Sequence, residues 1–247
     1  MPKFFVVSDI HGFYDEFKNA LDEAGFDSKN KEHYLICCGD YFDRGEKPKE
    51  VMDFLMGLDR VILIKGNHED LFYDLCYRGF PLYHDVSNGT DLTIQILANG
   101  YDDYNIQSLL KAVRPFSSLM INYFETKNYI FVHGWIPLNI NSDEVDEEKS
   151  YSFNPDWRNA TEAEWKAARW INGIDAAANG FIEPNKTIVC GHWNCSYGHF
   201  KVGETKSKFG DDADFTPYYN NGIIAIDACT AYSGKVNVLV LEDEFMG

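Results

Sequence analysis

FFVVSDIHG, residues 4–12, is the stretch of sequence that decides the fold class of this chain. Its four leading apolar residues predict a short buried strand, which ends in a turn that carries Asp9 and His11. The next segment, residues 13–24, repeats apolar side chains at helical spacing, and Gly25 is a typical helix stop. A strand, a polar turn and an amphipathic helix in this order predict the repeating unit of an α/β fold.

The same unit recurs along the chain. Residues 34–38 (YLICC) and 60–64 (RVILI) predict two further strands, and residues 48–56 predict the helix between them. Later strands are expected at residues 129–132, 187–190, 223–226 and 236–241. This alternation predicts an α/β sandwich built around a core sheet.

The segment from about residue 69 to residue 123 breaks this rhythm. Its apolar residues recur at helical spacing, which predicts a mostly helical insertion packed on the α/β body. Residues 134–160 read as an irregular polar loop, and residues 163–178 predict one helix. The sequence contains no repeat, low-complexity tract or flexible linker, so we expect a single domain over residues 1–247.

Composition and charge limit the classes of partner that this chain is expected to bind. The chain has 247 residues and a formal net charge of −17. A surface of that sign repels nucleic-acid backbones and anionic lipids, so we expect no nucleic-acid partner and no membrane partner. The N-terminus reaches Asp9 before a signal peptide could develop, and no apolar stretch approaches transmembrane length. The six cysteines include no C-x-x-C pair, so we expect a cytoplasmic protein with reduced thiols.

Metal-capable side chains follow five of the predicted strands, at the point where each strand ends. Four of the seven histidines lie at such positions, and in an α/β sheet ligands gather beyond the carboxyl ends of the strands. One such histidine alone is more often an ordinary core or loop residue, but five strand ends together favour a metal site. The residues concerned are Asp9, His11, Asp40, Asn67, His68, His133 and His192.

The types of donor indicate which metals fit. Imidazoles mixed with carboxylates and an amide oxygen suit Mn, Fe or Zn, and they differ from the all-oxygen cage of calcium. Even six of these seven residues are more ligands than a single tetrahedral ion holds, and six suit two ions bridged by one carboxylate. We therefore expect two divalent metal ions as cofactors, with Mn as the first candidate. Such a pair converts a bound water to hydroxide near neutral pH and clamps phosphoryl oxygens.

Five short motifs, which span residues 9–192, are recognisable together. They are DIHG at 9–12, GDYFDRG at 39–45, GNHE at 66–69, HG at 133–134 and GH at 191–192. They resemble the calcineurin-like metallophosphoesterase superfamily, and GDxxDRG followed by GNHE points to its phosphoprotein phosphatase branch. That branch includes bacterial and phage serine/threonine phosphatases and the symmetrical diadenosine tetraphosphatases. The resemblance implies a four-layer α/β/β/α sandwich, with the helical insertion at about 69–123.

The resemblance also implies roles for the residues of the motifs. His68 is implied as the proton donor to the leaving oxygen, with Asp43 orienting and charging its imidazole. Arg44 and Asn67 are implied to contact phosphate oxygens, Arg44 through its fork of donors. The implied metal ligands are Asp9, His11 and Asp40 for the first ion, and Asp40 as bridge, Asn67, His133 and His192 for the second.

Relatives of this branch supply a second phosphate-binding arginine between the two late histidines, often just after a tryptophan. Arg158 follows Trp157, whereas Arg169 precedes Trp170. Arg169 lies at the more familiar distance before His192, so we assign the role to Arg169 and keep Arg158 as the alternative.

The leading functional hypothesis is hydrolysis of phosphomonoesters by a hydroxide bound to the two metals. The expected substrate is a phosphorylated protein, at serine or threonine, or a small phosphoester. A diadenosine tetraphosphatase or another nucleotide hydrolase is the alternative enzyme, and the insertion at 69–123 could shape its pocket. An alternative of another class is a non-catalytic scaffold that binds phosphorylated partners, although such proteins usually lose the acid or a metal ligand.

Overall fold

The computed structural model describes residues 1–98, 102–141 and 150–246, and its strands form two five-stranded sheets and a small third sheet. The first sheet has the order β12-β1-β2-β3-β4. Its strands β1 to β4 run parallel and β12 is antiparallel to β1. Their bounds are Lys3–Val7, His33–Cys37, Val61–Ile64, Met120–Ile121 and Leu239–Glu242 for β1, β2, β3, β4 and β12.

The second sheet has the order β10-β11-β9-β6-β5. The neighbours β11, β9 and β6 are parallel, and antiparallel strands flank them on both sides. The bounds are Phe124–Glu125, Tyr129–Phe131, Thr187–Cys190, Tyr218–Asn220 and Ile223–Ala225 for β5, β6, β9, β10 and β11. The carboxyl ends of β6 and β9 therefore lie at one edge of this sheet, as those of β1, β2 and β3 do in the first.

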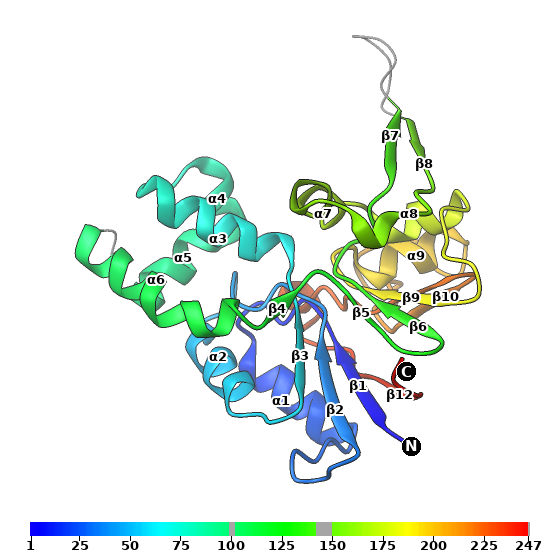
Figure 1. Ribbon diagram of the computed structural model, residues 1–247, viewed down its shortest axis with the longest axis horizontal. Coiled ribbons are helices and arrows are strands. Elements are labelled where there is room, and N and C mark those ends of the chain that lie inside the picture. The colour runs from blue at the N-terminus through cyan, green and yellow to red at the C-terminus, as the bar shows by residue number, and fades with distance from the viewer. Residues whose placement is uncertain (99–101, 142–149, 247) are drawn as a thin grey trace.

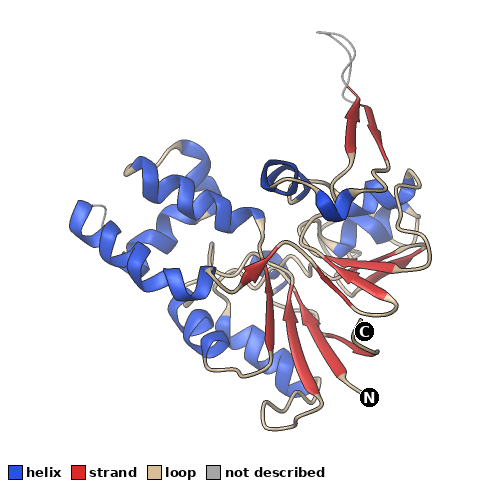
Figure 2. Cartoon of the chain, in the orientation of Figure 1, coloured by secondary structure: helices blue, strands red, loops and turns tan. Residues whose placement is uncertain are grey.

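Helices cover the outer face of each sheet (Figures 1 and 2). Helices α1 (Tyr14–Glu23) and α2 (Pro48–Met56) pack on the first sheet through Phe17, Leu21 and Val51, all fully buried. On the outer face of the second sheet, the buried side chains of Trp157, Trp165 and Ile174 pack against the strands. The helices on that side are α7 (Glu162–Ala168), α8 (Gly173–Ala178) and α9 (Cys195–Lys201).

A third apolar cluster joins the two sheets to each other. It contains Phe4, Val6 and Ile36 from the first sheet and Phe131 and Val189 from the second, and each of these side chains is fully buried. Successive residues of a strand point to opposite faces, so Phe5 and Val7 face α1 while Phe4 and Val6 face the second sheet. The four-layer α/β/β/α sandwich is thereby confirmed.

The helical insertion is confirmed, with bounds that differ slightly from 69–123. It consists of α3 (Asn67–Arg78), α4 (Tyr83–Asn88), α5 (Thr90–Ala98) and α6 (Asp103–Ser117). Its own apolar core includes Phe72, Leu75, Ile94 and Val113. Because α3 begins at Asn67, two of the expected site residues lie on the first turn of a helix. At the other end of the predicted insertion, Met120–Ile121 form β4 of the first sheet.

Several local expectations differ from the structure, and the last strand begins at Leu239, three residues after the expected start at Val236. Within the predicted loop 134–160, β7 (Asn139–Asn141) pairs with β8 (Ser150–Ser152), and Trp157–Asn159 form a 3₁₀ turn; residues 142–149 lie outside the described residues. The helix expected over 163–178 is divided into α7 and α8, because Asn172 caps a new helix through the backbone N–H groups of Ile174 and Asp175. Helices α9 and α10 (Thr230–Ser233) are not expected from the sequence.

Within the described residues, no helix is long and apolar enough to cross a membrane.

Phe116, near the end of α6, anchors the insertion to the core, since its ring lies 5.2 Å from that of Tyr41 and 5.3 Å from that of Phe42. We expect Phe116→Ala to lower the free energy of unfolding by about 3–5 kcal/mol, because it leaves a cavity among buried aromatic rings. Urea denaturation followed by circular dichroism measures this change. The control Tyr83→Ala, at a side chain that is 89% exposed, should shift it by no more than about 0.5 kcal/mol. Equal effects of the two changes would contradict this packing.

Candidate active site

The metal-capable residues lie where the carboxyl ends of both sheets meet. Asp9 follows β1, Asp40 follows β2, Asn67 begins α3 after β3, and His133 and His192 follow β6 and β9. Asp9, Asp40 and His192 have positive φ angles of 53°, 57° and 65°. Non-glycine residues seldom adopt this region, and such strain is concentrated at functional sites.

Close approach of the two sheets depends on Gly191, which precedes His192. A Cβ atom at this position would lie 1.9 Å from Oγ of Ser8 and 2.1 Å from Oδ2 of Asp9. The absent side chain lets the backbone N–H of His192 donate to Oδ2 of Asp9 at 2.9 Å. Ser8 donates to the same oxygen at 2.6 Å. The other oxygen of Asp9, Oδ1, is thus left facing Nε2 of His11, at 3.9 Å.

Asp40 lies between two groups of potential ligands. Its Oδ2 is 3.7 Å from Nε2 of His11, and its Oδ1 is 3.3 Å from Nε2 of His133. Atoms at this spacing can share an ion that lies about 2.0–2.2 Å from each of them. Two compact groups of potential ligands, His11–Asp40–His68 and Asp40–His133–His192, have Asp40 in common. The arrangement therefore fits a pair of ions, and Asp40 would contribute to the site of each.

The contacts of His133 favour a cation beside it. Its Nδ1 lies 2.7 Å from the carbonyl oxygen of Cys38, which can only accept, so Nδ1 carries the proton. Burial lowers the pKa of His133 to about 3, so the ring is neutral at pH 7 and Nε2 holds a lone pair. That lone pair faces the amide oxygen of Asn67 at 2.7 Å. Two electron-pair donors that converge in this way fit a shared metal ion.

The pKa shifts of the remaining candidate ligands also favour bound cations. Burial raises the pKa of Asp9 and Asp40, and the neighbouring carboxylates of Asp9 and Glu69 raise that of Asp40 further. Burial lowers the pKa of His192 to about 3 and holds that of His11 well below its usual range. Neutral imidazoles and mutually repelling carboxylates in one buried place would be stabilised by bound cations.

His68 and Asp43 form a buried pair beside this centre. Nδ1 of His68 lies 2.7 Å from Oδ2 of Asp43, so the carboxylate accepts and Nδ1 carries the proton. Nε2 of His68 points the other way and lies 3.8 Å from Oδ2 of Asp40. Arg44 lies at the exposed side of the same place, with its guanidinium nitrogens 3.0 Å from Nε2 of His11 and 3.4 Å from Nε2 of His68.

Two acidic residues near the candidate ligands have no role assigned from the sequence. Glu69 is buried, and its carboxylate accepts from the backbone N–H groups of Asp40, Tyr41 and Gly66 at 3.0, 3.0 and 2.8 Å. Asp227 is buried after β11, and burial together with Asp9 raises its pKa. Asp227 could have been found by the strand-end rule, but the role of Glu69 depends on a contact between turns that the sequence pattern does not specify.

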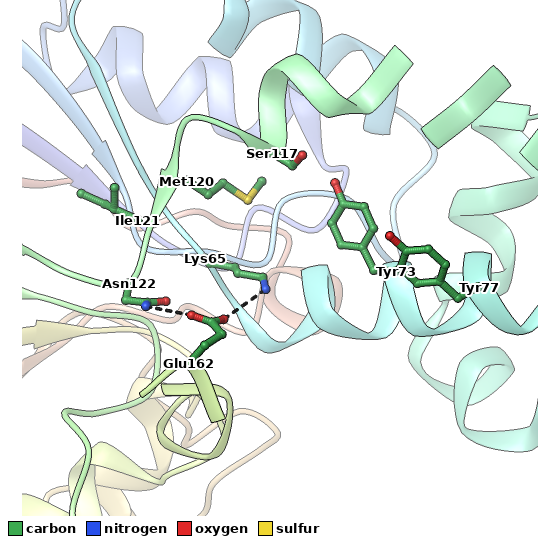
Figure 3. Close-up of a pocket in the computed structure, with 8 residues that line it drawn as sticks. All are labelled: Lys65, Tyr73, Tyr77, Ser117, Met120, Ile121, Asn122 and Glu162. Atoms are coloured by element: carbon green, nitrogen blue, oxygen red, sulfur yellow. Dashed lines mark hydrogen bonds and ion pairs between the residues drawn. The ribbon is translucent and has the colours of Figure 1, made fainter. Parts of the chain in front are cut away.

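The two candidate arginines are both engaged in ion pairs. Arg169 is buried, and its terminal nitrogens bond to Oδ2 of Asp70 at 2.8 Å and to Oε1 of Glu162 at 2.7 Å. Glu162 also lies between Lys65 and Asn122 on the wall of a 420 Å³ cavity (Figure 3). Arg158 is paired with Glu125 and Glu183 and stacks on Trp157. The assignment of Arg169 to phosphate therefore stays a prediction.

We expect Glu69→Gln to lower the free energy of unfolding of the metal-free protein by about 1–3 kcal/mol. The reason is that one acceptor oxygen is replaced by an NH2 donor that faces backbone N–H groups. The same change should weaken manganese binding, because it releases the turn that carries Asp40. Urea denaturation and calorimetric titration with Mn²⁺ measure the two effects. Glu50→Gln, at an exposed position on α2, is the control, and a result equal to this control would refute the role of Glu69.

Comparisons with known proteins relate the chain to a known family. A family model described as Calcineurin-like phosphoesterase matches residues 2–222. The bis(5'-nucleosyl)-tetraphosphatase (symmetrical) of Buchnera aphidicola is 41% identical over 66 residues, which are 26% of this chain and 23% of that protein. The enzyme of the same description from Nitrosococcus oceani is also 41% identical over 66 residues, again 26% of this chain and 23% of that protein. The chain thus matches less than a quarter of the length of these curated relatives.

Solved structures share the fold at low sequence identity. A cold-active protein tyrosine phosphatase has a TM-score of 0.54 at 19% identity, with 98% of this chain and 74% of that chain covered. A protein provisionally described as a diadenosine tetraphosphatase has a TM-score of 0.53 at 16% identity, with 98% and 91% covered. Since the family model covers most of the sequence, the chain belongs to the calcineurin-like phosphoesterase family.

Proposed function

We propose that this chain hydrolyses phosphoesters at a centre of two divalent ions, with His68 as the proton donor. The observation that carries the proposal is the position of Asp40, whose two carboxylate oxygens face two separate groups of potential ligands while Nε2 of His68 faces the same place. We propose Mn as the ion, with Fe and Zn as alternatives. The proposed ligands are Asp9, His11, Asp40, Asn67, His133 and His192.

The residues of the chain would divide the chemistry among them. Bound ions would neutralise charge on the phosphoryl oxygens and make a water molecule nucleophilic. Arg44, the exposed cation beside His11, would hold further phosphoryl oxygens and orient the ester. His68, charged and aligned by Asp43 at Nδ1, would donate its Nε2 proton to the leaving oxygen. Asn67 would contact the phosphate as well as the metal.

For the substrate we propose a phosphomonoester, carried by a serine or threonine of a protein or by a small molecule. Phosphomonoester hydrolysis requires only the ions, the arginine and the acid described above, and no second anchoring site for the rest of the substrate. A proton donor matters most when the leaving group is an alkoxide, as it is for phosphoserine and phosphothreonine, because an unprotonated alkoxide leaves slowly.

A second candidate substrate, a dinucleoside polyphosphate, is favoured by aromatic surface next to His192. The rings of Trp170 and Trp193 lie 5.8 and 6.0 Å from that of His192, and the two side chains are 48% and 39% exposed. Trp170 also lines a cavity of 310 Å³ together with Leu138, Tyr151 and Phe181. Exposed indole rings beside a phosphate site are suited to stacking with nucleobases.

His68→Asn tests the proposed proton donor. We expect it to slow phenyl phosphate hydrolysis by about 100-fold or more, the usual contribution of a general acid, and to slow p-nitrophenyl phosphate hydrolysis far less. The reason is that p-nitrophenolate leaves without a proton. Steady-state kinetics on the Mn-loaded protein measure both rates, and His33→Asn, in β2 at the far end from the site, is the control. Equal slowing of both substrates would exclude His68 as the acid.

Trp170→Ala tests the second candidate. If the substrate is a dinucleoside polyphosphate, the change should raise the KM for diadenosine tetraphosphate about tenfold through loss of base stacking, with phenyl phosphate unaffected. Tyr219→Ala, at a 60% exposed side chain on β10, is the control. Chromatography of the products distinguishes ADP from inorganic phosphate. Release of phosphate from phosphopeptides, with no cleavage of the dinucleotide, would instead support the phosphomonoester proposal.

A further inference from the structure

The helical insertion contacts the proton-donor pair at the junction between α4 and α5. Gly89, which ends α4, has a φ of +80°, and a Cβ atom there would lie 2.6 Å from the backbone nitrogen of Arg44. The backbone of the insertion therefore packs directly on the turn that carries Asp43 and Arg44. A side chain at position 89 would force the two segments apart.

Two threonines of α5 extend this contact to the carboxylate of Asp43. Thr90 donates its hydroxyl to Oδ2 at 2.5 Å, and Thr93 donates to Oδ1 at 2.7 Å. Both threonines are completely buried, and Asp43 is only 1% exposed. Thr93 could also bond to the carbonyl oxygen of Gly89, but that distance is longer, at 3.3 Å. The single hydroxyl proton of Thr93 is therefore better placed for the hydrogen bond to Asp43 than for the one to Gly89.

These hydroxyls fix the orientation of Asp43. Its Oδ2 accepts from Thr90 and from Nδ1 of His68, while Oδ1 accepts from Thr93. A carboxylate held at both oxygens cannot rotate without losing a hydrogen bond in a place that excludes water. The direction of its lone pairs in turn sets the plane of the imidazole and hence the direction in which Nε2 points.

We propose that Thr90 and Thr93 are positioning residues for the proton donor, so that the helical insertion is part of the catalytic apparatus. They act through Asp43 on His68 and touch neither substrate nor metal. This inference rests on the proposed role of His68 as the acid. A valine at either position retains the branched shape and removes only the hydroxyl, so it isolates the hydrogen bond from the packing.

The experiment compares Thr90→Val, Thr93→Val and the double variant in the full-length, Mn-loaded protein. We expect kcat for phenyl phosphate to fall about tenfold in each single variant and further in the double variant, with little change in KM. The kcat for p-nitrophenyl phosphate should change less than twofold. Thr90→Ser and Thr93→Ser, which restore the hydroxyl, should recover the rate with phenyl phosphate.

Two measurements separate positioning from a structural role. Thr126→Val removes the hydroxyl of another fully buried threonine, at the second sheet, and it should leave the ratio of the two rates unchanged. Metal content should be the same in all variants, and the downfield Nδ1–H proton resonance of His68, observed in the Mg-loaded protein, should shift or broaden only in the Thr90 and Thr93 variants. If the double variant does not fold, the single variants carry the test.

The Asp43→Asn variant distinguishes the positioning role of the two threonines from the proposed acid role of His68. If Asp43→Asn slows phenyl phosphate selectively and the threonine variants do not, the positioning role is wrong while the proposed acid stands. If Asp43→Asn slows both substrates equally, the acid pair itself is wrong, and the inference fails with it. Equal slowing of both substrates by the threonine variants, or no recovery with serine, would also overturn the inference.

Discussion

A single buried carboxylate, that of Glu69, joins the two turns on which the site depends. It accepts from backbone N–H groups of Gly66, Asp40 and Tyr41, so the end of β2 and the start of α3 are held by the same three-atom group. A second hydrogen bond joins the same two turns, in which the backbone N–H of His68 donates to Oδ1 of Asp40 at 3.0 Å. This reciprocal contact fixes Asp40, the proposed bridging ligand, relative to His68, the proposed proton donor, although 28 positions separate them in sequence.

The second constraint is the meeting of the two sheets at their carboxyl ends. The inner apolar cluster aligns β1 and β2 with β9, and Gly191 lets the turn after β9 approach Asp9 closely enough for a hydrogen bond. The left-handed backbone at Asp9, Asp40 and His192 has a cost of order 1 kcal/mol or more for each residue. Burial of the sheets and the hydrogen bonds between the turns offset that cost, so the positions of these candidate ligands depend on the packing of the core.

The sequence was informative where function depends on local pattern and less so where it depends on tertiary contact. Strand ends located Asp9, Asp40, His133 and His192 because a period of apolar residues followed by a polar turn is a local signal. The contact of Thr90 with Asp43 spans 47 positions, and nothing in the helical periodicity of the insertion indicates which of its threonines faces the site. The division of 163–178 into two helices was missed for another reason: the capping side chain of Asn172 outweighs a continuous helical pattern.

Charge balance connects the metal centre with the choice of substrate. Asp9, Asp40, Glu69 and Asp227 are all buried; burial raises the pKa of Asp40 and Asp227, and repulsion from neighbouring carboxylates raises it further. Arg169 contributes little net charge in return, because Asp70 and Glu162 already neutralise it. Under the proposed function, Arg44 and the bound ions would supply the positive charge that meets a phosphate. A substrate dianion entering a chain of net charge −17 would otherwise be repelled, so phosphate binding should depend on prior occupancy by the metals, and the most highly charged substrates should depend on it most.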